Sequence, residues 1–411
     1  MTSIVESKAQ WHSPLAGKRI VLGVCGGIAA YKCLTLVREL KRANAEVRVV
    51  MTTGAQAFIQ PLSFQALSGE PVHHELLDPE AESAMSHIAL ARWADLIVIA
   101  PTSAHMLAKL RVGLADDLLS TLCLATTAPI AVVPAMNQQM WNHAATQENL
   151  KIVQQRGIAV WGPASGSQAC GEIGPGRMLE AEDILRAVQA HFVPKILQGK
   201  KFLITAGATQ EPIDDVRFIS NHSSGKMGVA LAYAAWEMGA VVTLISGVRI
   251  DSVHPEIHQI SIQTAVQMYE QVTQQLNNRL DCMIATAAVA DVRPLENNSG
   301  KLPKSELGAH ISITENPDIV RAVCQHTNRP KMVVAFAAEM HNMQQRAAEK
   351  LKKKGADWIV ANDVSQPDRG FNADNNAVSM LAKNNSEWIE FEWMPKLVLA
   401  RQLLAFWMKE L

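Results

Sequence analysis

Residues 96–104 read Leu-Ile-Val-Ile-Ala-Pro-Thr-Ser-Ala. The first five are apolar without interruption, and Pro101 ends the run. A strand that is buried on both faces of a parallel sheet shows this pattern, whereas a strand with one face in water alternates apolar and polar residues. Residues 96–100 therefore predict a central strand of an α/β sheet, with small and hydroxyl-bearing residues at its carboxyl end.

Strands and helices alternate on both sides of this run. Strands are predicted at 19–24, 46–51 and 130–133, and helices at 29–42 and 55–67. This alternation is typical of a doubly wound sheet with helices on both faces. The first half of the chain is therefore expected to form a Rossmann-like α/β domain.

The alternation begins again after residue 200. Strands are predicted at 202–205, 241–245, 283–285, 332–335 and 358–360, and a helix at 225–238. Residues 191–200, which contain Pro194 and Gly199, are the best candidate for a linker between the two halves. We expect two doubly wound domains, 1–192 and 193–411.

Composition narrows the class of protein. The 411 residues are 48% hydrophobic and 19% charged, and the net charge of −1 predicts no broad attraction to nucleic acid or to an anionic membrane. No run approaches the roughly 18–20 apolar residues of a membrane span, and the N-terminus lacks the apolar segment of a signal peptide. Six cysteines without a CxxC pair argue against a disulfide framework or a zinc site. These features predict a cytoplasmic protein.

A pair of glycines follows the first predicted strand, in Gly-Gly-Ile-Ala-Ala-Tyr-Lys at 26–32. Glycine lets the backbone approach a phosphate, and a helix that starts here would offer N–H donors. The spacing is not GxGxxG and does not support a dinucleotide site. An ordinary strand-to-helix turn explains the pair equally well.

Three further groups are candidates in the first half. Val-Pro-Ala-Met-Asn at 133–137 ends a predicted strand at Asn137, and His87 precedes a helical stretch. Five of residues 166–178 are Gly or Pro, which argues against a regular helix or strand and predicts a mobile lid that carries Cys170. A thiol on a lid can move a proton once the lid closes. The alternatives are that His87 has a structural role and that Cys170 lies in an ordinary loop.

Taken together, the segments 26–32, 86–88, 134–137 and 169–171 make residues 16–190 similar to the flavin-dependent cysteine decarboxylases, especially those that act on phosphopantothenoylcysteine. The resemblance implies a flavodoxin-like domain that binds FMN. It implies a base at His87, a group that binds the substrate carboxylate at Asn137 and a proton donor at Cys170. The flavin contacts that it implies are Gly26, Gly27, Thr53, Thr102, Ser103 and Met136. His105 stands where the family has Asp or Asn, and it is expected to alter flavin contacts without removing activity.

The chemistry of that family explains why a flavin is needed. A carboxylate beside an unactivated thiol cannot leave, because the carbanion would have no electron sink. The family's flavin oxidises the cysteine thiol to a thioaldehyde, which accepts the electrons as CO2 departs. The reduced flavin then reduces the enethiol, so that no external oxidant is consumed.

The second half has its own phosphate-binding candidate. Ser-Ser-Gly-Lys at 223–226 precedes a predicted helix, but Met227 stands where a Walker motif requires Ser or Thr. A helix N-terminus with Arg217 close by can still bind a phosphate, and a capped helix start is the alternative.

Residues 220–228 and 361–364 make the region from about 200 to 411 similar to the phosphopantothenate–cysteine ligases. The resemblance implies that a carboxylate attacks the α-phosphorus of CTP and that cysteine then displaces CMP. It also implies that Mg2+ bridges the phosphates, but it does not identify the protein ligands of the metal. It implies substrate contacts at Arg217 and Asn221, and catalytic roles for Asn221 and for Lys301 on a mobile loop. The CTP contacts that it implies are Ala285, Thr286, Ala287, Asp291, Lys301, Pro317, Asp318, Ile319, Phe336, Lys350 and Lys354.

This sequence departs from the ligase pattern at three places. Ala208 and Gln210 stand where the family prefers Pro and Arg. Pro303 interrupts the run of loop lysines, which leaves open whether Lys301 or Lys304 is the important one.

The two halves resemble enzymes of consecutive steps in coenzyme A biosynthesis, which favours a bifunctional decarboxylase and ligase. The alternatives are a decarboxylase of peptidyl cysteines and a flavin-binding regulatory protein of the same fold. The expected partners are 4′-phosphopantothenate, cysteine and CTP. In the two families that the chain resembles, the decarboxylase half forms trimers and the ligase half forms dimers. By analogy, we expect a homo-oligomer that combines both kinds of contact.

Overall fold

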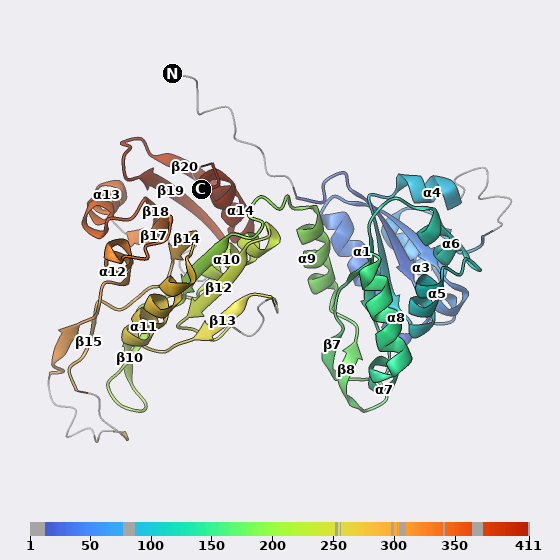
Figure 1. Ribbon diagram of the computed structural model, residues 1–411, viewed down its shortest axis with the longest axis horizontal. Coiled ribbons are helices and arrows are strands. Elements are labelled where there is room, and N and C mark those ends of the chain that lie inside the picture. The colour runs from blue at the N-terminus through green and yellow to red at the C-terminus, as the bar shows by residue number, and fades with distance from the viewer. Residues whose placement is uncertain are drawn as a thin grey trace. The chain divides into compact units, whose positions relative to one another are not determined.

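The computed structural model describes residues 13–76, 87–250, 254, 256–296, 300–301, 303, 310–339, 342–363 and 373–409. The chain divides into two compact units, Met1–Val193 and Pro194–Leu411 (Figure 1). Each unit is an α/β structure built around its own sheet, as the sequence predicts. The units are therefore described one at a time.

A six-stranded parallel sheet in the order β3-β2-β1-β4-β5-β6 forms the centre of the first unit. Its strands are β1 (Arg19–Val24), β2 (Glu46–Met51), β3 (Val72–His73), β4 (Leu96–Thr102), β5 (Ile130–Pro134) and β6 (Ala159–Val160). Its helices are η2 (Ile28–Tyr31), α1 (Lys32–Arg42), α2 (Thr53–Gln56), α3 (Pro61–Ser68), α4 (His87–Trp93), α5 (Ala104–Val112), α6 (Leu118–Ala125), α7 (Gln138–Asn142), α8 (Ala144–Gln155) and α9 (Ala181–Phe192). All seven residues of β4 are buried, as a central strand requires.

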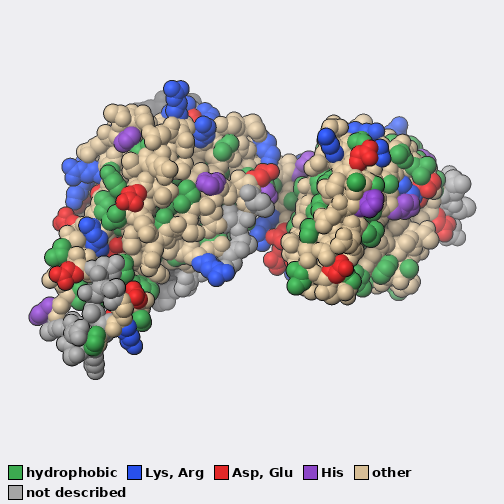
Figure 2. All heavy atoms as spheres, turned by 60° about the horizontal axis from the view of Figure 1, so that its bottom comes forward, with side chains coloured by type: hydrophobic (Ala, Val, Ile, Leu, Met, Phe, Trp, Pro, Cys, Tyr) green, Lys and Arg blue, Asp and Glu red, His purple; other side chains and the backbone are tan. Residues whose placement is uncertain are grey.

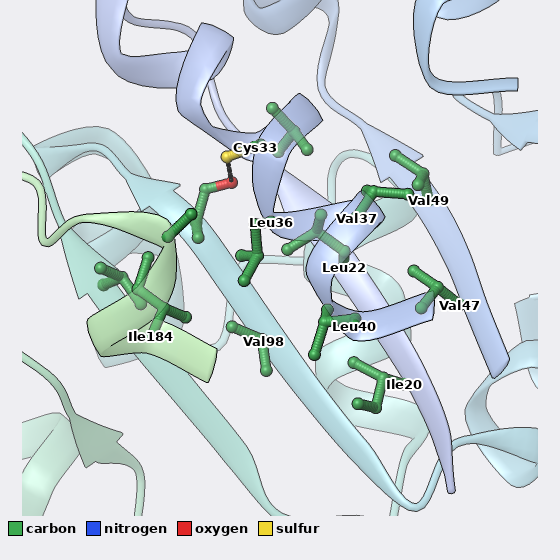
Figure 3. Close-up of a cluster of buried hydrophobic side chains, with 14 of the residues drawn as sticks. Ile20, Leu22, Cys33, Leu36, Val37, Leu40, Val47, Val49, Val98 and Ile184 are labelled. Carbon is green, nitrogen blue, oxygen red and sulfur yellow. Dashed lines mark hydrogen bonds between the residues drawn. The ribbon is translucent and has the colours of Figure 1, made fainter. Parts of the chain in front are cut away.

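Alternate residues of each central strand face opposite layers of helices. Leu36, Val37 and Leu40 of α1 and Ile184 of α9 pack against Leu22 and its neighbours on one face (Figure 3). Residues Val21 and Ile97 point to the other face, where α4, α5, α6 and α8 cover them. This two-sided burial explains the continuous apolar run at 96–100 and confirms the doubly wound fold.

One predicted helix of the first unit is wrong. The single helix expected at 55–67 is two helices, α2 and α3, with Gln60 in extended conformation between them. Pro61 is the first residue of α3, where its missing N–H and fixed φ are tolerated, and the chain before it cannot continue a helix. The helix expected at 29–42 is η2 followed by α1, and the helix expected at 225–238 is one residue shorter at each end. Most of the remaining predicted strands extend by one to four residues.

The second unit contains an eight-stranded sheet in the order β13-β12-β9-β14-β17-β18-β19-β20. The first six strands in that order are parallel, and β19 and β20 are antiparallel to their neighbours. The strands are β9 (Lys201–Ala206), β12 (Val241–Ser246), β13 (His258–Ser261), β14 (Cys282–Ala285), β17 (Met332–Glu339), β18 (Trp358–Asp363), β19 (Asn375–Ala382) and β20 (Ile389–Pro395). The helices are α10 (Lys226–Glu237), α11 (Ala265–Gln275), η3 (Leu276–Asn278), α12 (Ile319–Gln325), α13 (Met343–Lys354) and α14 (Lys396–Trp407).

Helices cover both faces of this sheet as well. Met268 and Val272 of α11, with α12 and α13, pack on the face that contains Leu203 and Met283. Helices α10 and α14 pack against each other, and α10 contacts β9 and β12. Two short antiparallel ribbons are added outside the sheet: β10 (Gln210–Pro212) with β11 (Phe218–Ser220), and β15 (Val292–Pro294) with β16 (Ile313–Glu315).

The surface agrees with the charge balance of the sequence. Acidic and basic side chains both occur on the visible face of each unit in Figure 2. No helix within the described ranges combines the length and the apolar character that crossing a bilayer requires.

Candidate functional sites

The loops after β1 and β4 meet at the carboxyl edge of the first sheet. The chain passes from β1 to β2 on one side and later crosses to β4 on the other, so these loops flank the point where the strand order reverses. Open α/β sheets bind ligands at this point. The backbone N–H of Cys25 donates to the Pro101 carbonyl at 3.2 Å, which joins the two loops.

Gly26 lets the loop after β2 join them. A Cβ at Gly26 would lie 2.8 Å from the carbonyl carbon of Gly54, closer than a side chain tolerates. Gly27 has an extended backbone, and no described atom lies within 4 Å of its Cβ position. Thr53 is the first residue of α2 beside this contact. Close backbone packing with open space next to it fits a phosphate-bearing ligand such as FMN.

Two predicted flavin residues after β4 have structural roles of their own. The Ser103 hydroxyl caps α5 by accepting from the Met106 N–H at 3.2 Å. Thr102 is fully buried, donates to the Ile99 carbonyl at 2.5 Å and accepts from the Val133 N–H at 3.1 Å. The Thr102 side chain therefore ties β4 to β5, and its carbonyl also accepts from the Ala135 N–H at 3.0 Å.

The Gly- and Pro-rich segment is an ordered hairpin, contrary to the expectation that it contains no regular strand. Strands β7 (Ala164–Ser167) and β8 (Ile173–Arg177) pair antiparallel, with an irregularity between Ala164 and Ser165. A two-stranded ribbon leaves one edge of each strand unpaired, so Pro175 costs no ladder bond there. A Cβ at Gly176 would lie 2.4 Å from the Met136 carbonyl oxygen, so glycine is needed where the hairpin meets the loop after β5.

The hairpin brings Asn137 and Cys170 together. Asn137 Nδ2 donates to Glu172 Oε2 at 2.6 Å and lies 3.4 Å from Cys170 Sγ. Asn137 Oδ1 accepts from the Gln139 N–H at 2.8 Å and so caps α7. Met136, beside it, donates its backbone N–H to the Gly176 carbonyl at 2.9 Å. Two of the three residues predicted to act on the substrate therefore share one site, and Glu172, which the sequence did not single out, completes it.

Exposure separates Cys170 from the other thiols. Cys170 is exposed, whereas Cys25, Cys33 and Cys123 are buried. Burial raises the pKa of Cys25 and of Cys123 to about 12, and Cys33 donates to the Ala100 carbonyl at 2.9 Å. Cys170 is the thiol of this unit that can meet a substrate.

The third predicted residue, His87, lies elsewhere. It is the first residue of α4, and in Figure 1 that helix lies at the top of the unit while α7 and the β7–β8 hairpin lie at the bottom. Within the described ranges no hydrogen bond joins His87 to Asn137 or Cys170. A single copy of the chain does not bring all three residues together.

In the second unit a cavity of about 600 Å³ opens at the carboxyl edge of the sheet. Its wall consists of the N-terminus of α10, the loop after β14, the start of α12, the middle of β17 and one face of α13. The predicted ligase residues that line it are Asn221, Ala285, Thr286, Ala287, Asp291, Pro317, Asp318, Ile319, Phe336, Lys350 and Lys354. Residues from five separate segments of the sequence therefore line one cavity.

Hydrogen bonds hold the loop after β14 in place. The Thr286 hydroxyl donates to the Thr205 carbonyl at 2.5 Å, and Asn221 Nδ2 donates to the Val289 carbonyl at 3.1 Å. Asn316 Nδ2 donates to the Ala290 carbonyl at 2.9 Å. Thr205 is the register partner of Ala285 on β9, the strand next to β14, so the order of the strands determines where this loop lies.

The lysines of α13 face the cavity as their four-residue spacing predicts. Lys350 Nζ lies 2.6 Å from Glu339 Oε1, and Lys354 Nζ lies 3.2 Å from Asp318 Oδ1. Asp291 and Asp318 are the carboxylates among the described residues that line the cavity. In that same part of the chain no three His, Cys, Asp or Glu side chains gather into a metal site.

Two predicted ligase residues are not in the described cavity wall. Arg217, on the turn between β10 and β11, donates through Nε to the buried Asp214 carboxylate at 2.9 Å. Lys301 is exposed, and Lys304 lies outside the described residues. Lys226 of the phosphate-binding candidate 223–226 and Asn362 of the segment 361–364 also line the cavity. Asn376 and Lys396 line it as well, and no sequence pattern selected them.

Comparisons with known proteins agree with the division of the chain. Residues 9–193 match the flavoprotein family, and residues 197–410 match the C-terminal domain family of DNA/pantothenate metabolism flavoproteins. The coenzyme A biosynthesis bifunctional protein CoaBC of Vibrio vulnificus is 50% identical over 89% of this chain and 92% of its own length. The Escherichia coli protein of that name is 50% identical over 92% of this chain and 94% of its own length, and the Bacillus subtilis one is 40% identical over 95% and 96%.

Solved structures match each half separately. The C-terminal domain of a protein named CoaBC is 36% identical, covers 53% of this chain and 97% of its own, and has a TM-score of 0.44. A PPC decarboxylase mutant complexed with pantothenoylaminoethenethiol is 34% identical, covers 43% of this chain and 98% of its own, and has a TM-score of 0.39.

Proposed function

The chain belongs to the family of coenzyme A biosynthesis bifunctional proteins, and we propose from this that it couples 4′-phosphopantothenate to cysteine and then decarboxylates the product. The second unit is the ligase and the first unit is the decarboxylase. The observation that carries this assignment is the cavity of the second unit, which eleven predicted ligase residues line. Because ligase and decarboxylase residues occur in one chain, the bifunctional enzyme is favoured over a peptidyl-cysteine decarboxylase or a regulatory protein.

In the ligase reaction, the cavity holds CTP against the carboxylate of phosphopantothenate. That carboxylate attacks the α-phosphorus, pyrophosphate leaves, and the amine of cysteine then displaces CMP from the acyl-cytidylate. Lys350 and Lys354 supply positive charge for the phosphates, and Phe336 offers an aromatic face for the base. Asn221 holds both the reacting carboxylate and the loop after β14, to which it already donates. Asp291 and Asp318 are the carboxylates of the cavity that would hold Mg2+, which would supply positive charge to the phosphates.

In the decarboxylase, the loops around Gly26, Gly54 and Ser103 would hold FMN at the edge of the sheet. The flavin supplies reversible oxidation of the substrate thiol. Asn137 presents its side-chain amide to the substrate carboxylate, and Cys170, 3.4 Å from that amide, returns a proton to the product carbon. The hairpin that carries Cys170 covers the site and keeps water from it.

His87 acts as the base from a neighbouring copy of the chain. Helix α4 and the β7–β8 hairpin lie at opposite ends of the unit, so His87 reaches the Asn137–Cys170 pair of another subunit (Figure 1). This arrangement requires a homo-oligomer, which we propose to combine trimeric decarboxylase contacts and dimeric ligase contacts. The proposed location is the cytoplasm, where the three small-molecule substrates would be available.

Mixing inactive variants tests the shared site. His87→Asn and Cys170→Ser chains, each inactive as a decarboxylase, are unfolded together, refolded with FMN and assayed for CO2 release from phosphopantothenoylcysteine. A substantial fraction of wild-type activity should return, because mixed oligomers contain sites with both native residues. If His87 and Cys170 of the same chain form the site, no activity returns, and the proposed subunit sharing is wrong. Ligase activity, measured as CMP release, should stay normal in both variants.

A further inference from the structure

Two lysines to which the ligase resemblance assigns no role line part of the cavity in the second unit. Lys226 is the first residue of α10, and Lys396 is the first residue of α14. Lys396 is only 8% exposed. Because α10 and α14 pack against each other, both lysines belong to the same wall of the cavity.

The short segment 373–374 contacts both lysines. Lys226 Nζ lies 2.6 Å from Asp374 Oδ1, and Lys396 Nζ donates to the carbonyl of Ala373. The backbone N–H of Lys396 donates to the Asp374 carbonyl at 3.0 Å. The Asp374 side chain is 88% exposed, so its carboxylate can leave Lys226 without being stranded away from water.

The electrostatics of this cluster favour an anion. The hydrogen bond from Lys226 lowers the pKa of Asp374, which keeps that carboxylate ionised. Burial, followed by the positive charge of Lys226, lowers the pKa of Lys396. Two ammonium groups that repel each other are stabilised by a nearby anion, and here that anion is the side chain of Asp374.

Asn376 adds a neutral donor to the same wall. It is 6% exposed and lines the cavity, and its Oδ1 accepts from the Ala377 N–H at 3.0 Å. The side-chain amide N–H of a residue in this wall can donate to a ligand oxygen.

We propose that Lys226, Lys396 and Asn376 form a phosphate-binding subsite, which Asp374 occupies as an internal competitor until a substrate phosphate displaces it. The inference rests on the proposed ligase function and adds residues to it. A phosphate carries more charge and more acceptor oxygens than the single carboxylate that now pairs with Lys226, so it can displace that carboxylate. The phosphate belongs either to the triphosphate of CTP, and hence to the leaving pyrophosphate, or to phosphopantothenate.

Binding measurements on the full-length protein test this subsite. Inorganic pyrophosphate, CTP and phosphopantothenate are titrated separately by calorimetry into wild type, Lys226→Met, Lys396→Met and Asp374→Asn. Lys226→Met and Lys396→Met should weaken at least one ligand about 10-fold or more. Weaker binding of pyrophosphate and CTP would assign the subsite to the triphosphate. Weaker binding of phosphopantothenate alone would assign it to the phosphate of phosphopantothenate.

The aspartate variant separates the subsite from a structural role. If Asp374 competes with the ligand, Asp374→Asn should bind that same ligand several-fold more tightly. If Asp374 merely holds the fold, its loss should weaken binding. Unchanged binding of all three ligands in both lysine variants, or unchanged or weaker binding in Asp374→Asn, would overturn the proposal. Failure of the ligase function itself would be recognised independently, because wild type would then release no CMP from CTP, phosphopantothenate and cysteine.

Discussion

The side-chain amide of Asn137 lies 2.6 Å from a carboxylate oxygen of Glu172. Asn137 follows β5, whereas Glu172 lies in the turn of the β7–β8 hairpin, two residues after Cys170. This hydrogen bond, with that from the Met136 N–H to the Gly176 carbonyl, fastens the hairpin to the edge of the sheet. A substrate carboxylate that binds Asn137 must replace Glu172, so substrate binding and the position of the hairpin are coupled.

Asn137→Asp should abolish decarboxylation while leaving the ligase intact. The new carboxylate would face Glu172 at hydrogen-bond distance and would repel the carboxylate of the substrate. We expect the rate of CO2 release to fall by a factor of about 100 or more, ~2.7 kcal/mol in the activation free energy. CMP release and bound flavin serve as controls and should be unchanged. Normal decarboxylation in this variant would show that Asn137 does not bind the substrate carboxylate.

Gly26→Ala should yield protein with little bound flavin. The added Cβ would meet the Gly54 backbone at 2.8 Å and force the loops after β1 and β2 apart. Gly54→Ala is the matched control, because a Cβ there lies 3.5 Å from the nearest atom of Gly26, an ordinary contact. The ratio of visible flavin absorbance to protein should drop in the first variant only. Equal flavin content in both would place the cofactor away from this contact.

Lys350→Met and Lys354→Met should each raise the KM for CTP about 10-fold, ~1.4 kcal/mol, because each removes a cation from the cavity wall. Lys353→Met is the control, since Lys353 lies on the same helix but is exposed and outside the cavity lining. Its KM should change by less than about 2-fold, as for other exposed charges. Steady-state CMP release at saturating phosphopantothenate and cysteine measures all three. An equal effect of all three substitutions would indicate general electrostatics rather than direct contact.

The stability of the second unit should depend on one buried ion pair. Arg401 of α14 donates from Nε and Nη2 to the carboxylate of Glu237 on α10, at 2.8 and 2.9 Å, and both residues are at most 3% exposed. Arg401→Met leaves a buried carboxylate without its partner and should lower the free energy of unfolding by ~3–5 kcal/mol. The double variant Arg401→Met/Glu237→Met should recover most of that loss. Chemical denaturation of the two variants provides the comparison, and a double variant less stable than the single one would refute this reasoning.

The sequence predicted the strand-helix order well because buried parallel strands leave continuous apolar runs. The bounds of β1 and β2 are as predicted, and the loops that follow the strands contain most of the candidate residues. The hairpin β7–β8 was missed because its Gly and Pro residues hide strand pairing that depends on contact with Met136. Glu172 and Asp374 could not be selected, since a carboxylate shows no pattern until the fold gives it a partner.

Distance along the chain limited the prediction of the ligase cavity. Lys396 lies 170 residues after Lys226, and only the packing of α14 on α10 brings them to one wall. Likewise the separation of His87 from Cys170 is invisible in the sequence, because a resemblance assigns roles without saying which copy of the chain supplies each residue.

The most direct test of the bifunctional assignment is mass spectrometry of the products that one purified chain forms. The protein is mixed with 4′-phosphopantothenate, cysteine, CTP and Mg2+, with FMN added. We predict 4′-phosphopantetheine, with CMP, pyrophosphate and CO2 in equal amounts. Accumulation of phosphopantothenoylcysteine without phosphopantetheine would contradict the decarboxylase half, and the absence of any CMP or coupled product would contradict the account as a whole.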